Sequence, residues 1–369
     1  MKKHQIMVFI GNGFDIAVLK KYGKGITTKY DSFYSFFKYK YPDSNNLLIT
    51  YMEDAKSENK ENWSDFEAIL DEALHSLSKS DKKQADKLNE DLSEIQQAFS
   101  RFLNDVIDND IINNISKAND IILEHKDNCA RSTLTCSFLK DLSQVQYEVM
   151  RFHNEFKNHE SLKYIFINFN YTSLLDNYLY LNKEMFDPEP YSTSNNNIVL
   201  DLNPNKYQHV GFSDPYMQLM PIDIFHPHGI QDVPKSLLFG IENKNYCRQR
   251  DYRRVFVKSL WAQCQSKYND KFTKTELFII YGCSIGESDN WWWSRIYERL
   301  ISENPAELII YNYGKENEDV IKEKFIKNCC LENSDIGEIK KAKENIYIIN
   351  HGTDVEFYQE FMSLPELNI

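Results

Sequence analysis

Short apolar runs, each ended abruptly by small or polar residues, recur towards both ends of this chain. The first run covers residues 5–10, is rich in residues that favour strands, and stops at Gly11. An apolar pattern typical of a helix follows over residues 14–19. The first twenty residues therefore predict a strand, a glycine turn and a helix.

Between residues 32 and 158 the pattern changes to helical periodicity. Apolar residues repeat at helical spacing over residues 65–74 and 88–112. The charged stretch 79–87 between them is typical of a solvated turn. We interpret residues 32–158 as a large helical insertion.

Strand patterns return after residue 160 and alternate with helical ones. The predicted strands cover residues 164–167, 198–202, 222–225, 237–239, 277–281, 308–311 and 346–349. Helical patterns separate the later strands, at residues 255–267, 291–302 and 318–328. This alternation predicts an α/β fold: a Rossmann-like parallel sheet built from residues 1–31 and 159–369, with the helical insertion between its first two strands.

Composition and charge narrow the functions that fit. The net charge of −12 over 369 residues argues against a uniformly basic surface for nucleic acid. No apolar run reaches the length of a transmembrane helix, and the N-terminal run is too short for a signal peptide. The seven cysteines show no Cys-x-x-Cys spacing, so we expect reduced thiols, a cytoplasmic protein and no zinc site.

The glycine turn after the first run is the first candidate ligand site. A strand that passes through a glycine turn into a helix lets backbone amides approach a phosphate, and the helix dipole favours its charge. The third glycine of the dinucleotide fingerprint is missing, because Ile16 stands there. A tight turn with a purely structural role is the alternative. The candidate phosphate-binding residues are Gly11, Asn12, Gly13, Phe14 and Asp15.

Two further candidates follow later strands. Asn170 comes after the run at 164–167, where an amide can bind a ribose hydroxyl or a water without burying a charge; its alternative role is an Asx-turn. His226 and His228 follow the run at 222–225, and either can act as a general base near neutral pH. A metal pair is not supported, since no acidic or thiol ligand stands nearby. A structural histidine is the alternative.

The last candidate is the stretch of small residues after the run at 277–281. Gly282 leaves room for a nucleotide, and Ser284 and Asp289 can bond its hydroxyls. The same stretch matches Gly-x-Ser-x-Gly, which leaves open a serine hydrolase that uses Ser284 and His351. Because parallel strands present their carboxyl ends at one edge, we expect all four segments to line one crevice.

These segments resemble the AbiH-type bacteriophage abortive infection family. The resemblance rests on residues 10–15, 63–67, 169–172, 228–229 and 282–289, in that order along the chain. The order of glycine turn, Asn after a strand, His-Gly and Gly-x-Ser is also similar to the sirtuin-like NAD-binding fold of bacterial defence enzymes. The four zinc-binding cysteines of sirtuin deacylases are missing, which argues against a protein deacylase.

The resemblance implies an anti-phage glycohydrolase that consumes NAD as its substrate, releases nicotinamide and needs no metal. The glycine turn would hold the NAD phosphates, Asn170 would orient the nicotinamide ribose, and His228 would be the base. Gly282, Ser284 and Asp289 would meet the adenosine side.

The resemblance also implies a phage-derived trigger and a nucleotide ligand, and it leaves self-association open. The lack of a long apolar run predicts no membrane partner. Trp63, Asp65 and Glu67 either cap the crevice or anchor a helix. The alternative from another class is a module that senses a nucleotide without turnover.

Overall fold

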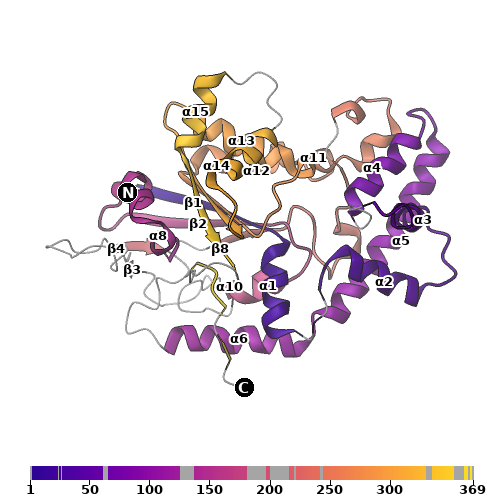
Figure 1. Ribbon diagram of the computed structural model, residues 1–369, viewed down its shortest axis with the longest axis horizontal. Helices are drawn as coiled ribbons and strands as arrows, with labels where there is room; N and C mark the ends of the chain where they lie inside the picture. Colours follow the sequence, from indigo (N-terminus) through magenta and orange to yellow (C-terminus); the bar gives the residue numbers. More distant parts are fainter. Residues whose placement is uncertain are drawn as a thin grey trace.

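The computed structural model describes residues 2–23, 25, 27–60, 65–124, 137–180, 197–199, 216–219, 222–241, 244–329, 335–352, 361–364 and 366–367. These residues form an eight-stranded sheet with helices packed on both faces (Figure 1). The strands are β1 (Lys3–Ile10), β2 (Ser161–Asn168), β3 (Asn197–Val199), β4 (Tyr216–Leu219), β5 (Asp223–Phe225), β6 (Leu277–Tyr281), β7 (Glu307–Tyr313) and β8 (Ile346–His351).

The strand order explains how the sheet grows along the chain. It runs β3-β4-β2-β1-β6-β7-β8, with β5 also paired to β2, and only the pair β3–β4 is antiparallel. The chain therefore extends the sheet from β1 to one side through β2 and β5, and then to the other side through β6, β7 and β8. The order reverses between β1 and β6. The predicted α/β class with a parallel sheet is confirmed.

The central strand β1 shows why its sequence is a continuous apolar run. Ile6, Val8 and Ile10 lie in one hydrophobic core, and Met7 and Phe9 lie in a second core on the opposite face. A strand of a parallel sheet is covered by helices on both faces, so both sets of alternating side chains must be apolar.

Helices fill the chain between β1 and β2 and separate the later strands. The first group is α1 (Asn12–Tyr22), α2 (Tyr30–Lys40), α3 (Leu47–Ser57), α4 (Phe66–Ser76), α5 (Lys82–Val106), α6 (Asn109–Glu124), α8 (Ser137–Asp141), α9 (Gln144–Val149) and η1 (Phe152–Glu155). The second group is α10 (Leu174–Tyr180), η2 (Pro234–Ser236), η3 (Lys244–Tyr246), η4 (Tyr252–Phe256), α11 (Lys258–Trp261), α12 (Cys264–Lys274), η5 (Glu287–Asp289), α13 (Asn290–Ile301), α14 (Glu318–Lys327) and α15 (Ile336–Glu344). Among the helices that the structure describes, none has the length and apolar character needed to cross a membrane.

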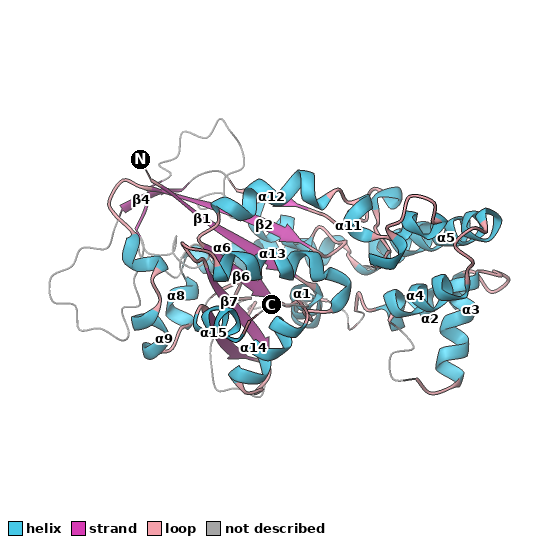
Figure 2. Ribbon diagram, turned by 90° about the horizontal axis from the view of Figure 1, so that it is seen from above, coloured by secondary structure: helices cyan, strands magenta, loops and turns pink. Residues whose placement is uncertain are grey.

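The described part of residues 32–158 is helical and contains no strand. Helices α2–α5 gather beyond one end of the sheet (Figures 1 and 2). Phe33, Phe66 and Phe99 nevertheless belong to the same hydrophobic cluster as Ile6 and Val8 of β1. The helices thus share a core with the sheet, and the domain boundaries proposed above stay a prediction.

Three predictions from the pattern are wrong, and residues 200–202 of the strand expected over 198–202 lie outside the described residues. The charged stretch 79–87 was expected to form a turn, but residues 82–87 form the start of α5. Residues 237–239 form no strand, although Leu237 and Phe239 are buried. Their backbone bonds instead to separate segments: the Leu238 N–H donates to the His228 carbonyl (2.7 Å), and the Gln96 side chain donates to the Leu237 carbonyl (2.6 Å). The helix expected over 255–267 is broken into η4, α11 and α12, with Gln263 at a φ of 53° before α12.

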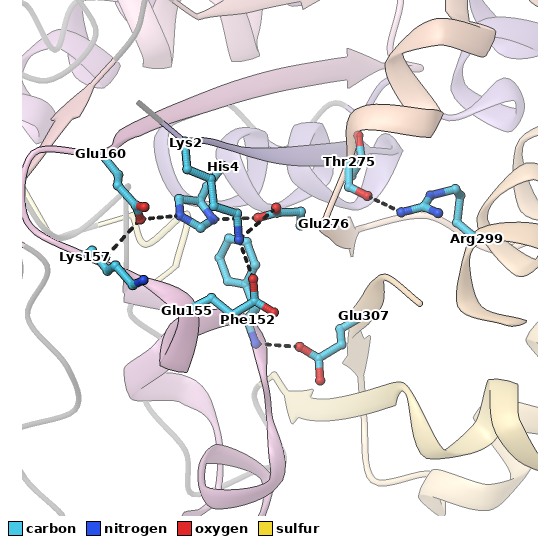
Figure 3. A network of polar contacts seen from close by, with 10 residues as sticks. All are labelled: Lys2, His4, Phe152, Glu155, Lys157, Glu160, Thr275, Glu276, Arg299 and Glu307. Atoms are coloured by element: carbon cyan, nitrogen blue, oxygen red, sulfur yellow. Dashed lines mark hydrogen bonds and ion pairs between the residues drawn. The ribbon is translucent and has the colours of Figure 1, made fainter. Parts of the chain in front are cut away.

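A buried histidine ties three strands together at the amino ends of the sheet (Figure 3). His4 of β1 is fully buried, with Nδ1 2.6 Å from Glu276 and Nε2 2.8 Å from Glu160. Two carboxylate partners require both ring nitrogens to carry protons. Burial alone would lower the pKa of His4, but the hydrogen bonds to Glu276 and Glu160 outweigh burial and raise it. The imidazolium therefore clamps β1 to the residues that precede β6 and β2.

A buried carboxylate, that of Glu307, anchors the end of the helical region to the sheet. Glu307, at the start of β7, accepts hydrogen bonds from the backbone N–H groups of Arg151 and Phe152 (3.0 and 2.8 Å). The Tyr347 hydroxyl of β8 donates to the same carboxylate at 2.8 Å. These bonds satisfy a charge that is only 3% exposed and fix where the chain enters β2.

Candidate functional site

A cleft of about 1750 Å³ opens at the carboxyl ends of the parallel strands. Its lining includes residues at or shortly after the ends of strands β1, β2, β5, β6, β7 and β8: Gly11, Asn170, His228, Gly282, Ser284, Tyr313 and His351. In open α/β sheets ligands bind at this edge, at the point where the strand order reverses. Here that point lies between β1 and β6.

The cleft gathers nearly all of the residues selected from the sequence. Its lining includes Gly11, Asn12, Gly13, Asp15, Asn170, His228, Gly282, Ser284 and Asp289. The Phe14 side chain is fully buried instead, with its ring 5.5 Å from that of Tyr178, so it packs the turn onto the core. The expected meeting of the four segments in one crevice is observed; their roles stay predictions.

The glycines of the first turn make room for the turn after β6. A Cβ on Gly11 would stand 2.6 Å from the Gly282 carbonyl oxygen, and one on Gly13 would stand 2.6 Å from the Gly282 Cα. Gly282 itself has a φ of 68°, in the region that favours glycine. The Gly13 N–H donates to the Gly282 carbonyl at 2.9 Å. Close packing of two backbone turns is therefore a structural reason for these glycines, beside the phosphate approach expected from the sequence.

A buried carboxylate fixes the orientation of Asn170. Asp15 is 1% exposed and accepts hydrogen bonds from the Asn170 amide (2.9 Å) and the Thr172 hydroxyl (2.7 Å). The Asn170 amide also donates to the Gly11 carbonyl at 3.1 Å. Both amide hydrogens are thus committed to oxygen acceptors, which leaves the Asn170 carbonyl oxygen to meet a ligand. Burial raises the pKa of Asp15 to about 7.

His228 belongs to a buried charge network. Its Nε2 lies 3.2 Å from Asp289 Oδ1, and its ring stacks on Phe169 with centroids 4.8 Å apart. The Lys258 ammonium lies 3.6 Å from the same Asp289 oxygen and forms an ion pair with Glu67 of α4. His228, Asp289, Lys258 and Glu67 therefore form a continuous chain of ionisable groups beside the cleft.

Lys258 and Asp289 hold each other in their charged forms. Burial favours the neutral form of each, but the charge of Lys258, followed by the interaction with His228, keeps the pKa of Asp289 well below its usual range. Burial likewise opposes the charge of Lys258, whose pKa is nevertheless raised by Asp289 and Glu67. Asp289 was expected to bind an adenosine hydroxyl. In the structure its carboxylate is already engaged by His228 and Lys258.

The other histidine of the motif, His226, lies outside this cleft. His226 Nε2 is 2.9 Å from Asp176 of α10, and His226 does not line the cleft. This contact ties the loop after β5 to α10, which is a structural role. The geometry thus separates the two histidines that the sequence left open as bases.

Two other side chains of the cleft, Ser284 and Cys283, could in principle act as nucleophiles, and they lie in different surroundings. Ser284 is exposed in the cleft lining, while the His351 ring stacks on Tyr281 with centroids 5.5 Å apart and packs edge-on against Tyr311 and Tyr313. The Cys283 thiol contacts backbone carbonyls, and burial raises its pKa well above the usual value. A thiol held in this neutral form is a poor nucleophile.

The acidic residues of the helical region divide between two roles. Asp65 caps α4 by accepting hydrogen bonds from the Glu67 and Ala68 N–H groups, both at 3.1 Å. Glu67, two residues later, pairs with Lys258 and lines the cleft. Trp63 lies outside the described residues. Asp65 also lines the cleft, so this motif both anchors the helix and contributes to the cleft lining.

The sequence analysis did not select Lys258 and Thr172. Lys258 interrupts an otherwise mostly apolar stretch at residues 255–261, and nothing in the pattern indicates that the residue is only 4% exposed. Thr172 belongs to the motif at residues 169–172, but its hydrogen bond to Asp15 joins residues 157 apart in the sequence, which no local pattern indicates. Among the residues that the structure describes, no group of His, Cys, Asp and Glu has the arrangement of a metal site.

These features define a class: an α/β protein with a parallel sheet and a charged ligand cleft where its strand order reverses. The family model of bacteriophage abortive infection AbiH matches residues 7–335. The chain belongs to this family. A search of curated proteins found no match.

Proposed function

We propose that this member of an abortive infection family cleaves NAD, releasing nicotinamide and ADP-ribose. The observation that carries the proposal is the meeting of a fixed Asn170 carbonyl and a His228–Asp289 pair in one cleft. The order of the parallel strands supports a nucleotide ligand, because it matches that of Rossmann-like sheets, which bind dinucleotides where the order reverses.

The reaction transfers the ADP-ribosyl group to water. The bond between the ribose C1′ and the nicotinamide nitrogen breaks, nicotinamide leaves with the electron pair, and a water oxygen bonds to C1′. Asn170 accepts a hydrogen bond from a ribose hydroxyl and holds the sugar in place. His228 takes the proton that the water loses. Because Nε2 faces the Asp289 carboxylate and carries a proton, Nδ1 is the accepting nitrogen.

The proposal is tested by incubating purified protein with NAD, separating the products and measuring the nicotinamide released. The assay is run with and without lysate from phage-infected cells as the source of a trigger. We expect His228→Ala and Asn170→Ala each to lower nicotinamide release by about 10²- to 10⁴-fold, the usual contribution of a general base or a positioning group. Circular dichroism confirms that each variant is folded.

His226→Ala is the matched control, since His226 follows the same strand but pairs with Asp176 outside the cleft. We expect this variant to retain most of the activity. Near-normal turnover by folded His228→Ala protein would overturn the base assignment. If NAD binds by calorimetry but no nicotinamide appears under either condition, the protein is a nucleotide sensor without turnover.

A further inference from the structure

The buried Lys258 ammonium has no place in the reaction described above, yet it contacts the carboxylate that pairs with the proposed base. Its Nζ lies 3.6 Å from Asp289 Oδ1, the oxygen that His228 Nε2 approaches to 3.2 Å. Its other partner, Glu67, comes from a helix far away in the sequence. A buried ammonium is unfavourable unless paired, so its position between two carboxylates calls for a reason.

We propose that Lys258 is a positioning residue that keeps His228 neutral by sharing the charge of Asp289. This inference rests on the proposed function for its catalytic meaning, although the charge effect can be measured without activity. An unshared Asp289 carboxylate would hold the imidazole as a doubly protonated cation. Such a cation has no lone pair and cannot accept a proton.

The charges around His228 decide the direction of this effect. The titratable groups that face it or its partners are Asp289, Lys258, Glu67, Tyr30, Tyr171 and Cys283. Burial raises the pKa of both tyrosines and of the thiol, so these three groups are neutral around pH 7. The remaining charges are two carboxylates and one ammonium. Lys258 therefore supplies the only fixed positive charge among these groups.

Removing different members of the network should move the protonation of His228 in opposite directions. Lys258→Met leaves two carboxylates without a cation, so the imidazole becomes their counter-charge. Asp289→Asn and Glu67→Gln each remove a negative charge and leave the ammonium, so the imidazole loses protons more readily. A residue that only fills space would not produce shifts of opposite sign.

Proton NMR of ring-labelled histidine measures this directly, with the His228 signal assigned from the His228→Ala spectrum. The expected result for Lys258→Met is a half-protonation pH for His228 at least one unit above that of the wild type, a tenfold change in proton affinity. Glu67→Gln and Asp289→Asn should each lower it. An unchanged or lowered value in Lys258→Met, or shifts of one sign in all three variants, would overturn the inference.

Two further comparisons keep the result interpretable. Lys258→Arg retains the charge and should keep the wild-type titration, even if packing changes; if Lys258→Met does not fold, Glu67→Gln still tests the direction. Nicotinamide release in Lys258→Met should regain its rate only at higher pH, where His228 becomes neutral. If the wild type releases no nicotinamide at any pH, the proposed function fails, while the NMR titration still decides the role of Lys258.

Discussion

The carboxylate of Asp15 should make the folded protein less stable as the pH rises. Asp15 is 1% exposed, and its burial raises its pKa from 3.8 to about 7. Between these two values the folded state holds a proton that the unfolded state has already released. Raising the pH through this window therefore removes stability, and below about pH 4 the two states bind the proton equally.

Replacing Asp15 with Asn should remove this cost while keeping the local contacts. Asn fits the same space, its carbonyl can accept from the Asn170 amide, and its own amide can donate to the Thr172 hydroxyl. Each pH unit inside the window corresponds to about 1.4 kcal/mol. The stability of Asp15→Asn relative to the wild type should therefore increase by about 3 kcal/mol between pH 5 and pH 8.

Urea unfolding at pH 5, 7 and 8, followed by tryptophan fluorescence, measures this difference. Asp105→Asn is the control, because it removes an exposed carboxylate from α5 and should show no comparable growth with pH. The variant should also release nicotinamide more slowly, since a carboxylate beside the cleft stabilises a positive charge developing on the ribose. A relative stability of Asp15→Asn that stays flat from pH 5 to pH 8 would refute the reasoning.

Three further outcomes follow from single contacts. Gly282→Ala should cost at least about 1 kcal/mol in the free energy of unfolding, because its φ is 68° and a Cβ would stand 2.8 Å from a backbone nitrogen. Gly25 also has a positive φ, 86°, but open space around it, so Gly25→Ala lacks the clash and should cost less in the same urea titration. Because the pKa of His4 is raised in the folded state, its contribution to the free energy of unfolding is complete below pH 6.5 and is lost as the pH rises through the folded pKa. His4→Gln should lack this loss of stability in thermal melts. Melting temperatures of the variant and the wild type that change identically with pH would contradict the clamp with Glu276. Ser284→Ala should raise the KM for NAD without abolishing nicotinamide release, because Ser284 is expected to contact the adenosine side rather than to act as a nucleophile. A covalent serine probe should leave the wild type unlabelled, and labelling that Ser284→Ala abolishes would favour a hydrolase.

The strands of the sheet could be predicted because their physics is local. A parallel strand covered on both faces is a continuous apolar run, and β1, β2, β6, β7 and β8 all fulfil this rule within a few residues of the predicted bounds. Residues 237–239 form the same kind of apolar run but no strand, because any buried segment is apolar whatever its backbone conformation. Hydrogen bonds from distant segments, which no local pattern contains, decide the outcome there.

The cleft was predictable for the same reason, and its electrostatics were not. Residues that follow parallel strands meet at one edge whatever their side chains are, so topology alone brings Gly11, Asn170 and Gly282 together. The contact between Lys258 and Glu67 joins segments 191 residues apart and depends on how α4 packs beside the sheet. The pairing of His228 with Asp289 likewise depends on the path of the loop after β6.

Three features that cost stability lie at or beside this cleft. Asp15 is a buried carboxylate, Lys258 is a buried ammonium, and Ile285 has a φ of 52°. A β-branched side chain in that backbone region is a genuine outlier, and such strain typically costs about 1–3 kcal/mol. Two of the three line the cleft, and the third contacts Asp289, which lines it. A sheet needs none of these features in order to fold, and their place at the cleft agrees with the ligand site proposed above.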